Sequence, residues 1–298
     1  MTGEDYVQAL IEYNKVITNY PDNGDAEDAQ YQLGYTYYKH EKYMEAITAF
    51  NTFLSKYPES DRAADAQYYI GASLYNAEDY VAAITAYNKV ISGYADNPAA
   101  ISAKYYIAMS NYSNNDYSSA VTAFTAFIND YPGSDRIVGA MYYRAIAKYE
   151  SENYTYAQAL SDFNTIVTNY PDGDYAVRAL YKAAWCYYQS EDFANAVQTY
   201  SRVISEYPQS SKVYDAYYWS AYTSYLDAAY PQAITKFTTY INLKPANKSA
   251  GEAWYYIGRS YEKNNDTVNA RIAYNTVINN YPNCNKYSEA QTRLAALP

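Results

Sequence analysis

Few side chains in this sequence belong to the types that carry out chemistry at neutral pH. The only histidine is His40, expected to be a solvated surface residue, and the only cysteines are Cys186 and Cys284. Without a second histidine or a nearby cysteine, one chain cannot assemble a catalytic triad, a thiol–imidazole pair or a histidine-based metal site. The ten glycines are scattered, and no glycine-rich phosphate loop occurs. The sequence therefore predicts a protein that is not an enzyme and that has no metal and no cofactor.

Carboxylates are the remaining candidates for acid–base chemistry. The pairs Glu78-Asp79 and Glu191-Asp192 stand where a helix is expected to begin, so helix capping accounts for them. Glycosidase-type chemistry needs two carboxylates that face each other across a cleft, and the sequence does not exclude such an arrangement.

Composition narrows the choice of partner. The formal net charge is −10 and the isoelectric point is near 4.7, which argues against nucleic acid and anionic membrane surfaces, because both attract basic patches. No apolar run approaches the roughly 18 residues of a membrane span. The opening residues Met1-Thr2-Gly3-Glu4 do not form a signal peptide. We therefore expect no transmembrane segment. If the protein is exported, we expect its leader peptide not to be present in this chain.

Neither the cysteines nor the glycosylation motifs settle the compartment. Cys186 is expected to be a small core residue and Cys284 an exposed thiol in a turn, about three repeats apart and therefore too distant to form a disulfide. Motifs for N-linked glycans occur at four asparagines, a number that chance would give in so asparagine-rich a chain: Asn111, Asn153, Asn247 and Asn265.

A 37-residue repeat fixes where the helices are expected, and the length of 298 residues equals eight periods plus two residues inserted in the fourth repeat. The repeat is marked by Tyr-Pro at Tyr20, Tyr57, Tyr131, Tyr170, Tyr207 and Tyr281, with degenerate copies at Tyr94-Ala95 and Lys244-Pro245. Proline disfavours α conformation in the residue before it, so each marker predicts the end of a helix. Between consecutive markers lie two helical stretches with a short break, as at 39–43 and 76–80.

Three positions recur in every repeat. The first stretch carries a small residue at Gly34, Gly71, Ala108, Ala145, Ala184, Ala221, Gly258 and Ala295. The second carries an alanine at Ala9, Ala46, Ala83, Ala120, Ala159, Ala196, Ala233 and Ala270, and an aromatic residue four positions later. A small residue lets a neighbouring helix approach closely, and the aromatic ring on the same face fills the space beside it. Each repeat is therefore predicted to be a helical hairpin.

This pattern resembles the tetratricopeptide repeat (TPR), whose small, alanine, aromatic and proline landmarks fall on Gly34, Ala46, Phe50 and Pro58. The extra residues per repeat and the Tyr-Pro turns are similar to TPR proteins of the bacterial cell envelope, such as the Tol-associated periplasmic coordinator and the outer-membrane assembly lipoprotein. The resemblance implies an all-α fold, a right-handed α-solenoid. Counting helices predicts seven whole repeats between half repeats at 4–20 and 285–297, all in one solenoid domain, 1–298.

Tyrosine makes up 45 of the 298 residues, and most tyrosines fall at repeat positions that the family fills with aromatics. The resemblance places part of them along a concave groove where such solenoids bind peptides. That groove is expected to contain Tyr35, Tyr69, Tyr106, Tyr143, Trp185, Trp219, Tyr222 and Tyr256. Amphipathic aromatics offer rigid contact area at low entropy cost. Simple packing of these rings against one another is the alternative.

The two half repeats suggest a second kind of contact. The register from residue 298 to residue 1 is unbroken, so copies stacked head to tail would complete one hairpin at each junction. That interface is expected to contain Tyr6, Leu10, Tyr13, Ile17, Leu294 and Leu297. The alternative is that the half repeats are caps, which solenoids need at their ends.

Two hypotheses for function follow. In the first, the chain is a non-catalytic scaffold whose copies stack into a filament in the cell envelope or outside the cell. In the second, it is a monomeric periplasmic or envelope adaptor that binds a partner segment in the aromatic groove. Both place the protein outside the cytoplasm.

Overall fold

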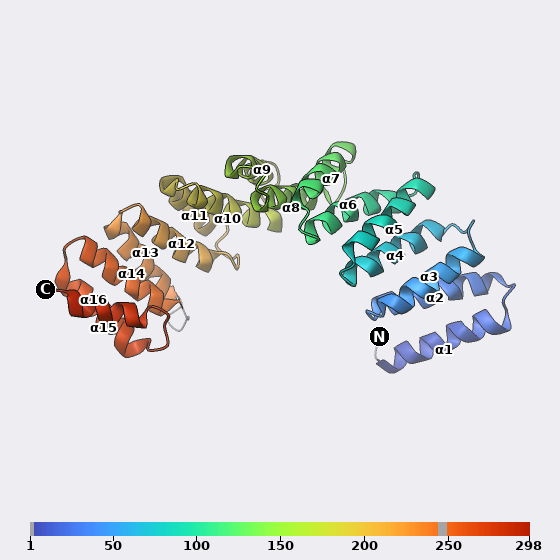
Figure 1. The fold of residues 1–298 in the computed structure, drawn as a ribbon, viewed down its shortest axis with the longest axis horizontal. Helices are drawn as coiled ribbons and strands as arrows, with labels where there is room; N and C mark the ends of the chain where they lie inside the picture. Colours follow the sequence, from blue (N-terminus) through green and yellow to red (C-terminus); the bar gives the residue numbers. More distant parts are fainter. Residues whose placement is uncertain (1–2, 244–248) are drawn as a thin grey trace. The chain divides into compact units, whose positions relative to one another are not determined.

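The structure, a computed structural model, describes residues 3–243 and 249–298, and the described residues form helices and turns without a strand (Figure 1). The helices divide into two compact units, Met1–Asn153 and Tyr154–Pro298. The first unit contains α1 (Gly3–Asn19), α2 (Gly24–Lys39), α3 (Tyr43–Lys56), α4 (Ala63–Asn76), α5 (Tyr80–Gly93), α6 (Pro98–Ser113), α7 (Tyr117–Asp130) and α8 (Ile137–Glu150). The second contains α9 (Tyr156–Asn169), α10 (Asp174–Gln189), α11 (Phe193–Glu206), α12 (Val213–Leu226), α13 (Tyr230–Leu243), α14 (Ala250–Lys263), α15 (Thr267–Asn280) and α16 (Tyr287–Ala296).

The all-α hairpin architecture is confirmed, and the single domain over 1–298 stays a prediction. The even-numbered helices are the first helices of the repeats, here called A helices, and the odd-numbered ones are the second, or B helices. Every B helix except α13, which ends at Leu243, ends just before the tyrosine of the turn: the N–H of Tyr57, for example, donates to the carbonyl of Phe53 before the chain turns at Pro58.

The turn inside most hairpins has three residues, and the second of them has a left-handed backbone with φ between 56° and 63°. These residues are Glu41, Glu78, Asn115, Glu191, Ala228 and Asn265. The side chain of the third turn residue often caps the B helix, as Asp79 does by accepting from the N–H of Ala82. The inserted residues lie between α8 and α9, at 151–155, where Thr155 and Gln158 form a capping box for α9.

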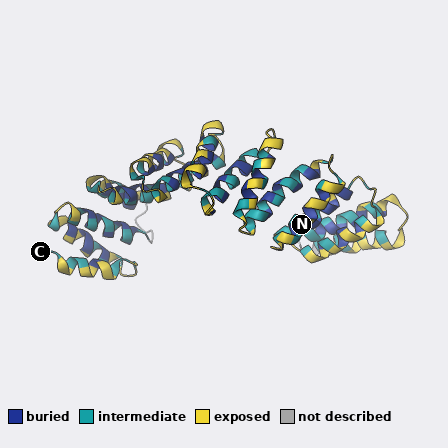
Figure 2. Ribbon diagram, turned by 45° about the horizontal axis from the view of Figure 1, so that its top comes forward, coloured by how far each residue is buried: buried dark blue, intermediate teal, exposed yellow. Residues whose placement is uncertain are grey.

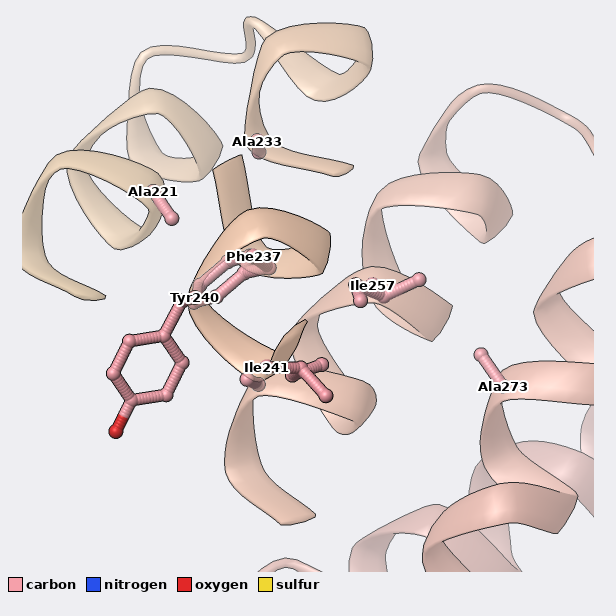
Figure 3. Close-up of a cluster of buried hydrophobic side chains, with 8 residues drawn as sticks. Ala221, Ala233, Phe237, Tyr240, Ile241, Ile257 and Ala273 are labelled. Carbon is pink, nitrogen blue, oxygen red and sulfur yellow. The ribbon is translucent and has the colours of Figure 1, made fainter. Parts of the chain in front are cut away.

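The core of each hairpin is the contact between a small residue of the A helix and an aromatic ring of the B helix. An added Cβ at Gly71 would lie 2.6 Å from Cε1 of Tyr87, and one at Gly34 would lie 2.9 Å from Cδ1 of Phe50. Figure 2 shows the buried residues along the helices of these hairpins. In Figure 3 the Phe237 ring of α13 lies among Ala221 and the side chains of neighbouring helices. These aromatic rings are fully buried in all B helices except α1.

The A helices begin in two alternating ways. The residues before α2, α6 and α10 are Asn23, Asn97 and Gly173, with ψ between 140° and 155°. The residues before α4, α8, α12 and α16 are Arg62, Arg136, Lys212 and Lys286, with ψ between −13° and 5°. The helix that departs from the alternation is α14, which follows Ser249 with ψ of −3°.

Each of the four basic residues stabilises its turn in the same way. Its backbone N–H donates to a side chain two residues earlier, which is Ser60, Ser134, Ser210 or Cys284. Its cationic group lies 5.1 to 5.9 Å from the ring centre of a tyrosine in the preceding A helix, which is Tyr31, Tyr105, Tyr181 or Tyr255. Cys284 therefore holds the place of a turn serine.

The small–aromatic contact gives a direct stability test. Replacing Gly71 by alanine puts a methyl group against the buried Tyr87 ring, so Gly71→Ala is expected to lower the free energy of unfolding by about 1–3 kcal/mol. Gly93→Ala is the control, because nothing lies within 4 Å of a Cβ at that helix end and alanine favours helix. Urea denaturation measures both, and equal stabilities would contradict this account of the core.

Candidate interaction surfaces

Part of the predicted aromatic groove stacks on the core rings of the hairpin before it. Tyr69 lies 5.7 Å from Phe50 with the two ring planes at 12°, and Tyr106 lies 5.8 Å from Tyr87 at 24°. Tyr143 on Phe124 and Tyr256 on Phe237 repeat the arrangement at 6.3 Å and 5.9 Å. One face of each of these rings is therefore covered by the chain itself.

The remaining predicted groove residues lie against these rings in each unit. Tyr35 is 5.2 Å from Tyr69 in the first unit. In the second, Trp185 is 4.6 Å from Trp219, and Tyr222 is 4.9 Å from Tyr256. All eight predicted residues are half-buried. Within each unit these residues lie on the A helices against other rings, with part of each ring open to solvent, and the eight residues are here called the aromatic row.

An ion pair takes the place of two aromatic rings at the last A helices, a feature that the sequence analysis missed. Glu262 occupies the repeat position of Tyr225, and Arg293 that of Tyr256. Their side chains form an ion pair at 3.0 Å, and the Tyr274 hydroxyl donates to the second Glu262 oxygen at 2.6 Å. The signal that could have found this pair is a double exchange: Glu262 stands where the earlier repeats have tyrosine, and Arg293 stands where most of them have an aromatic residue.

Burial raises the pKa of several tyrosines in each unit. Burial raises the pKa of Tyr31 and of Tyr112 to about 12. Burial also raises the pKa of Tyr69 and Tyr256, and neighbouring tyrosine hydroxyls add to the effect. Tyr69 and Tyr256 therefore present neutral hydroxyls and ring edges rather than phenolates, which suits contact with another polypeptide better than acid–base catalysis.

If the aromatic row is part of the core, removing one ring should lower the free energy of unfolding markedly. Tyr106→Ala removes a ring stacked on Tyr87 and is expected to lower the free energy of unfolding by about 3 kcal/mol. Tyr20→Ala is the matched control, since the Tyr20 side chain is 61% exposed. Thermal and urea denaturation compare the two. A loss below about 0.5 kcal/mol for Tyr106→Ala would mean that the ring serves only as surface.

The second candidate surface is one face of α1. The residues Ala46, Phe50 and Phe53 of α3 are fully buried between neighbouring helices, and their equivalents in the six later B helices are at most 3% exposed. The equivalents in α1, Ala9, Tyr13 and Val16, are only half-buried. Val7 and Ile11 are 53% and 44% exposed and line a surface hollow with Leu10, but their equivalents Val268 and Ile272 in α15 are exposed and line a hollow too. The open part specific to α1 is the face of Ala9, Tyr13 and Val16, here called the α1 face.

The structure places the residues predicted for self-assembly in different surroundings. Leu10, Tyr13 and Ile17 are half-buried on α1, whereas the Tyr6 ring lies 4.0 Å from the ring of the half-buried His40 and so faces α2. Leu294 and Leu297 pack against the core cluster around Tyr255 and Tyr274. In α16 the exposed residues include Gln291 and Ala295 instead. An apolar residue in an outer helix gives the same sequence signal whether it faces the core or a partner.

Among the described residues, one arrangement superficially resembles a catalytic pair. The ammonium of Lys236 donates to the hydroxyl of Ser220 at 2.6 Å, and burial lowers the pKa of Lys236. The Ser220 side chain is 1% exposed, so no substrate reaches its hydroxyl. Cys186 is equally buried, and its burial raises the pKa of the thiol to about 12, while Cys284 is half-buried. No group of three histidine, cysteine or carboxylate residues within the described ranges is placed to hold a metal ion.

Lys236 is expected to lower the free energy of unfolding, because its ammonium is partly desolvated. Other hairpins have an alanine at the same repeat position, such as Ala49 and Ala86. Lys236→Met is expected to raise the free energy of unfolding by on the order of 1 kcal/mol or less, because screening by solvent and the lost hydrogen bond to the buried Ser220 hydroxyl both reduce the gain. Burial lowers the folded-state pKa, so the gain is full below that pKa and disappears near pH 10.5, where the unfolded lysine is neutral too. Lys89→Met, at an exposed lysine, is the control. Equal stabilities of Lys236→Met and wild type at pH 7 would contradict it.

Three of the four glycosylation motifs lie in described residues. Asn265 is an exposed turn residue, Asn111 is half-buried in α6, and the Asn153 amide donates to Ser118 at 2.7 Å. Asn247 lies outside the described residues. No helix in the described part of the chain is both long and apolar enough to cross a bilayer.

Comparison with known protein families shows to which family the chain belongs. A model of the YfiO family, described as outer membrane lipoprotein, matches residues 1–79 and 60–180, which together exceed half of the chain. A tetratricopeptide repeat model matches residues 178–210 and 252–283. The chain belongs to the YfiO family of TPR proteins. The predicted resemblance to TPR proteins of the cell envelope is thereby confirmed, and this fold typically serves as a non-catalytic scaffold for protein–protein contacts.

Solved structures of TPR proteins share the fold. The C-terminal part of a TPR protein from Cytophaga hutchinsonii is 17% identical with a TM-score of 0.70, over 87% of this chain and 98% of that one. A TPR protein from Parabacteroides merdae is 13% identical with a TM-score of 0.56, over 91% and 98%. MamA from Desulfovibrio magneticus is 15% identical with a TM-score of 0.52, over 63% and 98%. A comparison with curated protein sequences found no match.

Proposed function

We propose that this TPR protein is a non-catalytic scaffold of the cell envelope whose copies associate with one another through the α1 face. The YfiO family model, which describes an outer membrane lipoprotein, supports the location outside the cytoplasm. Scaffolding is the typical role of the TPR fold, which supports this part of the proposal.

The observation that carries the proposal is the open α1 face. Seven other B helices bury the alanine, the aromatic ring and the third apolar residue of this face against an A helix. In α1 these side chains are half-exposed. Leaving such a face in water forfeits about 25 cal/mol per Å² of apolar surface, which a partner helix would recover. A contact between two different faces of the same chain repeats from copy to copy and builds a ring or a filament.

Solution mass tests the proposal. Sedimentation equilibrium over 1–500 μM should give a mean mass that rises above the 33.9 kDa of one chain as concentration increases. Negative-stain images at the upper concentrations should show chains of particles. A constant mass of one chain over the whole range would contradict self-association.

That contrary result would support the adaptor hypothesis, in which the aromatic row binds a segment of a partner protein. The observation in its favour is that Trp185, Trp219 and Tyr222 keep part of their surface open. Against it, most of the row is already covered by the chain's own rings, as the stacks of Tyr69 and Tyr106 show. We therefore rank self-association first.

A further inference from the structure

We infer that the α1 face binds helix α16 of a second copy, and that this joint reproduces the contact between A and B helices found inside the chain's own hairpins. The inference rests on the proposed self-association and specifies the surface that completes it. Gln291 and Ala295 of α16 would meet Ala9, Glu12 and Tyr13 of the second copy.

The internal hairpins supply the template for this joint. In α2 the amide of Gln30 donates to the carbonyl of Ala49 at 3.1 Å, four residues before Gly34 meets the Phe50 ring. In α4 the amide of Gln67 donates to the carbonyl of Ala86 at 3.2 Å, four residues before Gly71 meets the Tyr87 ring. In these two hairpins a glutamine followed four residues later by a glycine is thus part of the contact that docks the B helix, whereas the other internal A helices carry other residues at the glutamine position.

Helix α16 carries the same pair in an exposed position. Gln291 and Ala295 have the spacing of Gln30 and Gly34, but both are exposed, whereas Gln30 is 4% exposed. In α1, the carbonyl equivalent to that of Ala49 belongs to Glu12, and the ring equivalent to Phe50 is Tyr13. The half of the contact that is open on α16 therefore matches the half that is open on α1.

The alternation of helix starts supports the same order of helices. In the first unit, α4 starts after the basic residue Arg62, and the next A helix, α6, starts after Asn97. Helix α16 starts after the basic Lys286, and α2 starts after Asn23. Placing α16 before α1 and α2 of a second copy keeps the alternation of basic and asparagine starts.

Charge is complementary as well. Residues 1–56 contain nine acidic and four basic side chains, whereas residues 249–298 contain four acidic and five basic ones. Contact between these two parts brings an acidic surface to a weakly basic one, while contact between two copies of the first part brings like charges together. Glu12 stands at the place of Ala49, and its carboxylate already accepts from Gln8 at 2.6 Å and Lys15 at 2.8 Å within α1, so Gln291 is matched to the backbone carbonyl of Glu12.

Two blocking variants test the joint. Ala295→Glu puts a charged side chain on α16 where the Tyr13 ring would dock, and Ala9→Glu does the same on the α1 face. Each variant alone is expected to associate at least tenfold more weakly than the wild type, because one of the two required faces is lost in every copy. Mixed in equal amounts, they should form heterodimers and nothing larger, because the open α1 face of one variant fits the open α16 face of the other.

Controls separate the joint from folding and from other contacts. Ala296→Glu changes the neighbouring exposed residue, which lies at the repeat position of Tyr35 and not at that of Gly34, so it should associate like wild type. Thermal unfolding monitored by circular dichroism checks each variant, and Tyr13→Ser replaces Ala9→Glu if the latter loses helix.

The outcomes distinguish the two levels of the proposal. A wild-type mass that stays at one chain would overturn self-association itself. Undiminished association of Ala295→Glu, or failure of the two blocked variants to pair, would overturn the α16 joint and leave self-association standing through another surface.

Discussion

The close approach of an A helix to the aromatic ring of its B helix is the constraint on which the rest of this structure depends. At Gly34, Gly71 and Gly258 a Cβ would lie within 3 Å of the ring, so these contacts leave no space for a methyl group without adjustment. Other hairpins place alanine at the same position, as Ala184 does in α10, and bury it completely. The distance between the two helices is therefore adjusted in each hairpin, within the close packing that protein interiors require.

The aromatic row is a consequence of the same contact. Because the ring of the B helix is pinned against a small residue, its other face is available to the next A helix, and Tyr69, Tyr106, Tyr143 and Tyr256 stack there. Offset stacking of this kind contributes about 0.5–1.5 kcal/mol per pair beyond burial. The abundance of tyrosine is thus largely a packing solution. The hydroxyl lets a ring that is half in the core keep its edge in water.

The repeat made most of the fold predictable from the sequence. The small, alanine and aromatic positions can be recognised in the sequence because every hairpin needs the same helix–helix contact, so the same residue types recur every 37 positions. Details that depend on two positions at once were not predictable in the same way. The Glu262–Arg293 pair replaces an aromatic contact between neighbouring repeats, and the cation of Arg62 lies over a ring 31 residues earlier.

The direction in which a side chain of an end helix points could not be predicted from the sequence. Leu294 and Leu297 pack against the core of their own chain. Their apolar character alone does not distinguish this packing from a contact with a partner. The exposed Gln291 was informative only after Gln30 and Gln67 had been seen to hold carbonyls of α3 and α5. A hydrogen bond from a side chain to a helix carbonyl does not require the same residue in every repeat, so it cannot be recognised from the repeat pattern of one sequence.

In a repeat protein, stability is approximately a sum of the intrinsic stabilities of the repeats and of the interfaces between neighbours. The α1 face then has a simple physical meaning. Its alanine and aromatic ring are the residues that gain most from a neighbouring A helix, and they are kept here although solvent covers part of them. Val7 and Ile11 do not distinguish α1 in this respect, because their equivalents Met44, Val81, Val268 and Ile272 in other B helices are exposed apolar residues as well. The difference lies in the alanine, the aromatic ring and the third apolar residue, which every later B helix buries and α1 leaves half-exposed, and a neighbouring A helix is the contact that would bury them.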